Sequence, residues 1–258
     1  MRRVARAIAA ATLGMAIPAG AAEPVDIELV LAADVSISVD GSELDLQRQG
    51  LAAAFRDPEI IDAIVGNAAG VAVMLMVWAG IDQQHVGVDW AHLTDASSTL
   101  AFADAIDRAL AVDPELQGKT ALGNALFVAM KSLDANAFLG ARRKIDVSGD
   151  GHANEGLKPD RVRDYAVLSG VTINGLAIIN DEPYLEQYYR EHVIGGSGAF
   201  VMVAADYPDF VEAIRRKLLR ELTPVEVALR SVPRPAPTII GMPARDCRDL
   251  GEIMRCAQ

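Results

Sequence analysis

The amino-acid sequence predicts an α/β fold with a doubly wound, mainly parallel central sheet and helices on both faces. From residue 25 onward, apolar runs rich in β-branched residues alternate with segments whose apolar side chains recur at helical spacing. Most of these runs are apolar throughout, as expected of strands that are buried on both faces. A chain of 258 residues with 51% hydrophobic content can bury such a sheet in one large domain.

The first half of the pattern contains three strands and two helices. Residues 27–33 are nearly all apolar and predict the first strand, and residues 71–78 predict a second buried strand. Residues 86–90 predict a short edge strand that pairs with the second one. Between the first two strands, Ser42 and the residues up to Asp45 have capping-box spacing and begin a helix with apolar residues at helical intervals. A second helix is predicted over residues 98–110.

The second half of the pattern alternates more regularly. Leu122, Leu126 and Leu133 share one helical face, which predicts a helix over residues 121–133, directly after Thr120. The closing helix begins at Pro208, a residue that the first turn of a helix tolerates. The remaining segments predict strands at 145–148, 171–178 and 200–203, and helices at 160–168, 181–192 and 208–222.

Residues 1–22 have the parts of an export signal. A basic start with Arg2, Arg3 and Arg6 is followed by an apolar run and then by small residues up to Ala22, where we expect cleavage. A membrane anchor needs about 20 uninterrupted apolar residues, which is more than this run offers. We therefore expect a periplasmic or secreted protein whose mature chain has no membrane span.

The other end of the chain differs in composition from the domain predicted at residues 24–222. Five of the twelve prolines fall within residues 223–258, which predicts an irregular, Pro-rich C-terminal tail. Cys247 and Cys256 lie in this tail, and an oxidising compartment would let them form a disulfide bond.

The charge of the chain limits its partners. The formal net charge is −11, and loss of the signal, with its three arginines and no acid, makes it −14. Such a surface repels phosphate backbones and attracts cations. The composition therefore argues against nucleic acid as a partner and favours a cation.

Three polar turns lie at strand ends or helix starts. They are Asp34-Val35-Ser36-Ile37-Ser38, Gly118-Lys119-Thr120 and Ser148-Gly149-Asp150-Gly151. In a doubly wound sheet, ligands gather at the carboxyl ends of the strands. The turns offer oxygen and no sulfur, so they suit a hard cation such as Mg²⁺ or Ca²⁺.

These motifs, D-x-S-x-S, then G-x-T-x-x-G-x-A-L over residues 118–126, then D-G, resemble the metal-ion-dependent adhesion site of von Willebrand factor type A domains. The resemblance covers about residues 25–222, implies a Rossmann-like α/β fold, and extends to a bacterial subfamily of exported proteins that carry this domain. The metal ligands that it implies are Asp34, Ser36, Ser38, Thr120 and Asp150.

The resemblance also implies a role for each ligand. Ser36, Ser38 and Thr120 would bind the metal through their hydroxyls, and Asp34 and Asp150 directly or through water. Two carboxylates roughly neutralise Mg²⁺, with Mn²⁺ or Ca²⁺ as alternatives, and leave one coordination position open. In the family a partner's Asp or Glu fills that position. The implied partner is thus a protein or peptide with an exposed acidic side chain.

One position departs from the family pattern. The third motif is commonly Thr-Asp-Gly, whereas Gly149 precedes Asp150 in this chain, so a hydroxyl beside the site is missing. Asp146 is a poor substitute for Asp150, because it lies within the predicted strand.

Two other functions remain open. In a purely structural domain, Ser36 and Ser38 would satisfy backbone groups of a turn and Asp34 would be a helix-cap anion. The metal site would then be vestigial or only stabilising. In a metal-assisted hydrolase, His152 could act as a base, although we favour an exposed loop histidine. The chain has no GxSxG, HExxH, Walker or GxGxxG motif, so we predict no catalytic residue and no enzyme.

Some aromatic and acidic residues have two interpretations each. Trp78 and Trp90 fit core or sheet-edge packing better than a ligand platform. The acidic start of the predicted helix over residues 181–192 is explained by the helix dipole and consists of Asp181, Glu182 and Glu186. The tyrosines of the same helix could form a partner surface and are Tyr184, Tyr188 and Tyr189.

Overall fold

The structure is a computed structural model that describes residues 22–109 and 118–223. Six strands form one sheet in the order β3-β2-β1-β4-β5-β6. All neighbouring strands are parallel except β2 and β3, which are antiparallel. The strands are β1 (Glu23–Asp34), β2 (Val71–Trp78), β3 (Gln84–Leu93), β4 (Phe138–Gly149), β5 (Val171–Ile178) and β6 (Val201–Ala204).

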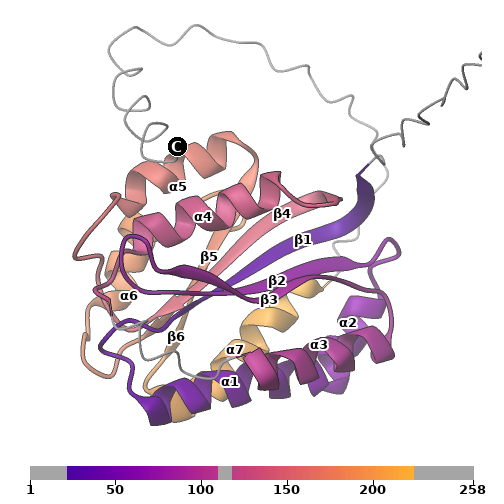
Figure 1. The fold of residues 1–258 in the computed structure, drawn as a ribbon, viewed down its shortest axis with the longest axis horizontal. Coiled ribbons are helices and arrows are strands. Elements are labelled where there is room, and N and C mark those ends of the chain that lie inside the picture. The colour runs from indigo at the N-terminus through magenta and orange to yellow at the C-terminus, as the bar shows by residue number, and fades with distance from the viewer. Residues whose placement is uncertain (1–21, 110–117, 224–258) are drawn as a thin grey trace, which may run out of the picture. The chain divides into compact units, whose positions relative to one another are not determined.

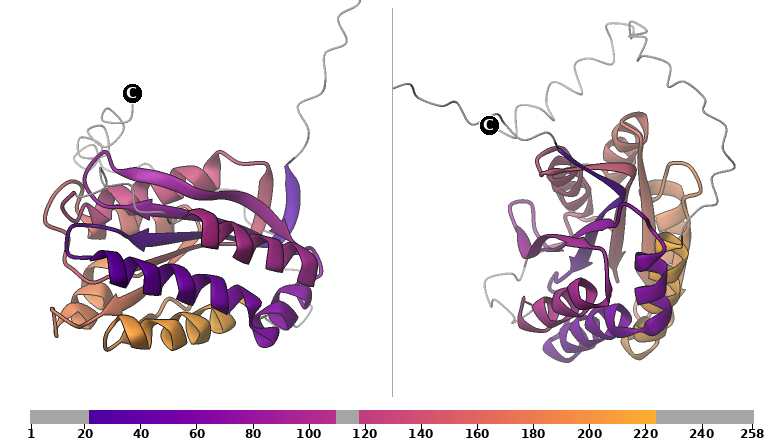
Figure 2. Two further views of the ribbon diagram at one scale, coloured as in Figure 1. Left: turned by 60° about the horizontal axis from the view of Figure 1, so that its bottom comes forward. Right: turned by 90° about the vertical axis from the view of Figure 1, so that its right-hand side faces the viewer.

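Helices cover both faces of the sheet (Figures 1 and 2). One layer contains α1 (Gly41–Arg56), α2 (Pro58–Val65), α3 (Ala96–Ala109) and α7 (Tyr207–Leu222). The other contains α4 (Leu122–Asp134), α5 (Pro159–Leu168), α6 (Leu185–Tyr188) and the π-helix η1 (Tyr189–Val193). The chain builds β2 and β3 on one side of β1, then β4, β5 and β6 on the other, so the predicted doubly wound α/β fold is confirmed.

The two faces of the sheet give two hydrophobic cores. Leu29 and Leu31 of β1 pack with the layer of α1 and α7. Val30 and Ala32 of the same strand pack with α4, α5 and η1. Successive side chains of a strand point to opposite faces, so an all-apolar strand serves both cores.

The first helix starts differently from the prediction. Its N-cap is Asp40, not Ser42: the Asp40 carboxylate accepts hydrogen bonds from the N–H groups of Ser42 and Glu43, at 2.7 and 2.9 Å. The Glu43 carboxylate accepts one from Asp40 N at 2.9 Å, which completes the capping box. The carboxylate of Asp40 is a charged acceptor two residues upstream of the predicted cap.

The segment predicted as one helix over residues 181–192 is also different. Its helical part begins only at Leu185, runs for four residues as α6, and continues as η1 to Val193. Pro183 disfavours helical backbone at the residue before it, Glu182. Asp181 and Glu182 thus precede the helix, so the helix-dipole interpretation is wrong for these two residues.

Other differences concern length. The prediction missed α2, which Asp57 caps by accepting a hydrogen bond from Glu59 N at 2.8 Å. Strand β4 begins at Phe138, well before the predicted residue 145, because it follows β1 along its length. Strands β2 and β5 have the predicted bounds.

Several predictions concern residues outside the described ranges. They are the export signal up to Ala22, the Pro-rich tail, the disulfide between Cys247 and Cys256, and the inward position of Leu110 at the end of a helix. These stay predictions, as do the domain boundaries. Within the described residues, no helix is both long and apolar enough to cross a membrane.

Candidate metal centre

The three polar turns meet at the carboxyl end of the sheet, between β1 and β4, where the strand order reverses. Asp34 is the last residue of β1, and Asp150 follows the last residue of β4. Thr120 stands two residues before α4. We call Asp34, Ser36, Ser38, Thr120 and Asp150 the candidate metal centre.

Hydrogen bonds connect four of these five residues. Asp34 Oδ1 accepts from Ser36 N at 2.8 Å, which folds the loop back over the strand end. The hydroxyl oxygens of Ser36 and Ser38 are 3.2 Å apart, and Ser38 Oγ donates to Asp150 Oδ1 at 2.8 Å. The first and third motifs therefore form one cluster of oxygen atoms.

Thr120 is held beside this cluster through its backbone. Its N–H donates to Asn154 Oδ1 at 3.0 Å, and its carbonyl accepts from Asn154 N at 3.0 Å. Ile37 N donates to Gly118 O at 3.0 Å, which joins the second motif to the first. A Cβ atom built on Gly151 would lie 3.8 Å from Thr120 Oγ1, so this hydroxyl borders the loop that carries Asp150. The hydroxyl makes no hydrogen bond to the other four residues.

The two carboxyl groups of the centre are buried without a cation. Asp34 is fully buried, and Asp150 is 3% exposed. Burial, followed by the charge of Asp150, raises the pKa of Asp34 to about 8, and burial also raises the pKa of Asp150. Among the described residues, no Lys, Arg or His forms an ion pair with either carboxyl group.

The oxygen atoms present fit a divalent cation. Asp34 Oδ2 is buried and has no hydrogen-bond partner in the described part of the chain. No group of three or more His, Cys, Asp or Glu side chains there could hold a metal. A cation at this place must consequently use the serine and threonine hydroxyls together with the two carboxylates, which suits a hard ion.

Three residues beside the centre were not predicted. Tyr207, the first residue of α7, donates its hydroxyl hydrogen to Asp150 Oδ2 at 3.1 Å. Gln47 of α1 donates from Nε2 to Asp34 O at 2.9 Å, and Asn154 holds Thr120. Gln47 could have been noticed as a polar residue on the inward face of an amphipathic helix. Tyr207 and Asn154 have no such signal, because their partners are distant in the sequence.

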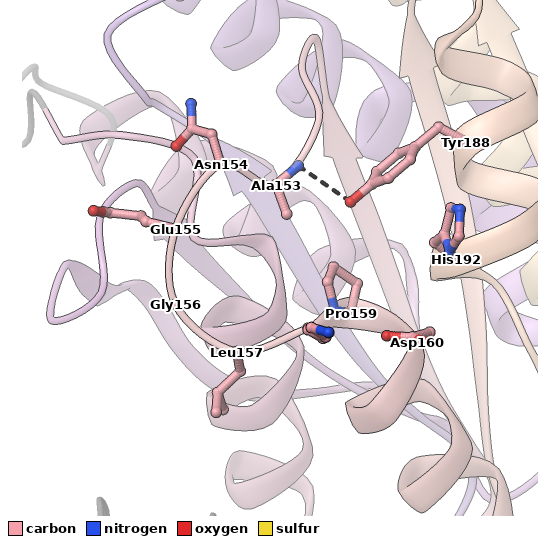
Figure 3. Close-up of a pocket in the computed structure, with 10 residues that line it drawn as sticks. Ala153, Asn154, Glu155, Gly156, Leu157, Pro159, Asp160, Tyr188 and His192 are labelled. Atoms are coloured by element: carbon pink, nitrogen blue, oxygen red, sulfur yellow. Dashed lines mark hydrogen bonds between the residues drawn. The ribbon is translucent and has the colours of Figure 1, made fainter.

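A pocket of about 460 Å³ lies beside the centre (Figure 3). The loop after Ala153 forms one wall, and Tyr188 and His192 form the other. Tyr188 Oη accepts a hydrogen bond from Ala153 N at 3.2 Å, which joins the two walls. Asn154 belongs both to this pocket and to the hydrogen bonds that hold Thr120.

His152 is half-exposed on the loop after Asp150, but it is not free. Its Nδ1 contacts Glu182 Oε2, and its ring packs edge-on against Tyr188 with the centroids 4.3 Å apart. Tyr189 is completely buried whereas Tyr184 is 78% exposed, so the three tyrosines do not share one surface.

The tryptophans pack as predicted. Trp78 is fully buried and donates from Nε1 to Ala32 O at 3.2 Å. Trp90 packs at the edge of the second core near Phe138, with ring centroids 6.3 Å apart.

The sheet order, the two helical layers and the loops at the carboxyl end define a von Willebrand factor type A-like domain. A von Willebrand factor type A structure from Catenulispora acidiphila has a TM-score of 0.52 and 19% identity, over 76% of this chain and 42% of that chain. The chain belongs to the family described as "Protein of unknown function (DUF1194)", which matches residues 24–226.

Two further solved structures share the fold. The pilus adhesin SpaC from Lactobacillus rhamnosus GG has a TM-score of 0.55 and 16% identity, over 76% of this chain and 30% of that chain. Proximal thread matrix protein 1 from the mussel byssus, with a zinc-occupied MIDAS motif, has a TM-score of 0.51 and 15% identity, over 76% and 45%. The chain thus spans less than half the length of these three proteins. No curated protein matches the sequence.

Proposed function

We propose that the mature protein is an exported, divalent-metal-dependent binding module whose metal captures an acidic group of a protein partner. The metal ligands are Asp34, Ser36, Ser38, Thr120 and Asp150, on a domain over residues 24–222. The metal is Mg²⁺, with Mn²⁺ or Ca²⁺ as alternatives. We infer export to the periplasm or beyond from the basic and apolar start of the sequence.

One observation carries this proposal. Asp34 and Asp150 are both buried, and burial, followed by the charge of Asp150, raises the pKa of Asp34. The described residues around the two carboxyl groups provide hydroxyls but no cation. Burying charge without compensation is costly, and a divalent ion would neutralise both groups. A bound ion would supply Lewis acidity and an open position, which an outside carboxylate can fill.

The surroundings support capture of a peptide or a protein surface. Ile37 and Ile81 are large apolar side chains at the carboxyl end of the sheet, 70% and 44% exposed. The pocket between Ala153 and Tyr188 offers room for a neighbouring side chain. A pilus adhesin and a protein with a metal-occupied MIDAS motif among the structural neighbours agree with this kind of function.

The first test is calorimetric titration of Mg²⁺, Mn²⁺ and Ca²⁺ into the metal-stripped mature chain. We expect the wild type to bind one ion and the Asp34→Asn and Thr120→Ala variants to bind at least about tenfold more weakly. The matched control is Asp146→Asn, since Asp146 is equally buried on β4 but faces α7 rather than the centre. This control should bind like the wild type.

Each alternative has its own outcome. Equal binding by all four proteins would place the ion elsewhere, and no binding by the wild type would leave a structural domain. Turnover of a phosphoester or peptide panel that is lost in the His152→Ala variant would instead favour a hydrolase. Partner capture is tested with immobilised peptides containing Asp or Glu against matched Asn or Gln peptides. Binding should require both the acid and the metal.

A further inference from the structure

Gly149 stands where two oxygen atoms leave no room for a side chain. A Cβ atom built on this residue would lie 2.7 Å from Asp34 Oδ2 and 2.8 Å from Tyr189 Oη. Both values are shorter than a carbon atom tolerates, so a side chain here would force Asp34 or Tyr189 to shift. The hydroxyl of Tyr189 and the carboxylate of Asp34 therefore border the same space beside Gly149, at the end of β4.

Both oxygens are buried and have no partner. Asp34 Oδ2 and Tyr189 Oη are among six such side-chain atoms within the described residues, and both side chains are completely buried. Buried polar atoms in native proteins almost always have partners, and an exception calls for an explanation such as an ion. Both oxygens border the space beside Gly149, and one bound ion at the candidate metal centre would account for both.

Two glycines leave room for the side chain of Tyr189. Gly175 on the neighbouring strand β5 also lacks a side chain, and a Cβ atom there would lie 2.6 Å from Tyr189 Cδ1. Gly149 thus makes room for the hydroxyl and Gly175 for the ring. Tyr189 is the first residue of η1, whose wide turn is closed by a hydrogen bond from Ile194 N to Tyr189 O at 3.0 Å. Single π-helical turns occur often at functional sites.

We propose that Tyr189 is a positioning residue of the metal centre, and this inference rests on the proposed function. When the cation is bound, Tyr189 Oη donates a hydrogen bond to Asp34 Oδ2 and holds that carboxylate toward the ion. The Tyr189 hydroxyl comes from a distant segment of the chain. It supplies a hydroxyl group beside the site, which glycine at position 149 does not provide.

A purely structural role for Tyr189 makes a different prediction. If the residue only fills the slot between Gly149 and Gly175, phenylalanine would fill it equally well, because the ring is unchanged. The Tyr189→Phe variant removes one oxygen atom and no packing. Any loss of metal affinity in this variant thus reports on the hydroxyl.

The test uses the mature chain with Tyr189→Phe and the control Tyr184→Phe. Tyr184 lies in the same segment, but its side chain is 78% exposed. We expect Tyr189→Phe to weaken Mg²⁺ and Mn²⁺ binding by about tenfold or more, as loss of a hydrogen bond to a ligand does. Tyr184→Phe should bind like the wild type, and the metal-free melting temperature of Tyr189→Phe should not fall.

A second measurement does not depend on affinity. Metal binding should change the near-ultraviolet absorbance of the buried Tyr189 and of Tyr207, whose hydroxyl bonds to Asp150, so that a metal-induced difference spectrum appears in the wild type and in Tyr184→Phe. In Tyr189→Phe this spectrum should lose the contribution of Tyr189 and keep only that of Tyr207.

The outcomes separate this inference from the proposed function. If the wild type binds metal, Asp34→Asn does not, and Tyr189→Phe binds and absorbs like the wild type, only the role of Tyr189 is wrong. If the wild type binds none of the three ions, the proposed function is wrong and the role of Tyr189 is wrong with it.

Discussion

The protein buries two pairs of acidic side chains, and the two pairs are compensated in different ways. Asp34 and Asp150 lie at the carboxyl end of the sheet among hydroxyl groups. Asp146 and Glu221 lie between the sheet and α7 together with Lys217, a trio that we call the ion cluster. Lys217 is fully buried, contacts Asp146 Oδ1, and stands 3.0 Å from Glu221 Oε1.

The two sites differ in whether the chain itself supplies a cation. In the ion cluster, Asn174 Nδ2 also donates to Glu221 Oε1 at 2.6 Å, so cation and hydrogen bonds come from the chain itself. The candidate metal centre has the hydrogen bonds but no cation among the described residues. A buried acidic pair needs compensation in either case. The ion cluster therefore carries its own compensating lysine, whereas under the proposed function the candidate metal centre would take a cation from outside.

Helix α7 touches both sites and makes the comparison direct. Its first residue, Tyr207, bonds to Asp150, while Lys217 and Glu221 near its other end belong to the ion cluster. Substitutions at the two sites can therefore be compared by their effect on the free energy of unfolding. The two effects should have opposite signs.

Removing the internal cation should have the largest effect. The Lys217→Met variant leaves two buried carboxyl groups uncompensated, and we expect it to lose about 3–5 kcal/mol in the free energy of unfolding. Urea denaturation measures this loss. The control is Arg56→Met, which removes surface ion pairs with Asp104 and Asp107, at 2.6 and 2.7 Å, and should cost about 1 kcal/mol or less. Equal losses in the two variants would show that the ion cluster does not hold α7.

Removing a charge from the metal centre should act in the opposite direction. In chelator, the Asp34→Asn variant should be about 2 kcal/mol more stable than the wild type, because it relieves a buried, uncompensated acid. In saturating Mg²⁺ the order should reverse, since only the wild type gains stability from the bound ion. Urea denaturation under both conditions checks this. A variant that is less stable than the wild type even in chelator would contradict the comparison.

The sequence pointed to the residues of the candidate metal centre but not to those of the ion cluster. D-x-S-x-S and the later motifs are short patterns at strand ends, so their residues could be assigned before the structure was known. Strands β2 and β5 were equally clear, because buried strands are continuous apolar runs. Local patterns of this kind depend only on neighbouring residues.

The residues that were missed depend on distant contacts. Lys217 looks like a solvated position on an amphipathic helix, and nothing near it in the sequence reveals Asp146 on β4. The sequence allowed Tyr189 to share a partner surface with Tyr184, whereas the structure buries Tyr189 beside Gly149. These positions are set by how the helical layers pack on the sheet, which periodicity does not encode.

The smallest expected effect concerns the pH dependence of the ion cluster. Burial, followed by the charge of Glu221, raises the pKa of Asp146 from its ordinary 3.8 to about 7. Between these two values the folded state holds more protons than the unfolded state, so the contribution of Asp146 to stability falls as pH rises and levels off above about pH 7. We expect a fall of at most about 2 kcal/mol between about pH 5 and pH 7.

The Asp146→Asn variant isolates this contribution, because asparagine does not titrate and leaves Lys217 paired with Glu221 alone. Asp34 also has a raised pKa and remains in both proteins, so its contribution cancels in the difference between their urea-denaturation profiles. We expect the wild type to lose stability relative to the variant as pH rises from about 5 to 7. Parallel profiles would mean that Lys217 keeps Asp146 charged throughout this range, and the ion cluster would then be fully compensated by its own lysine.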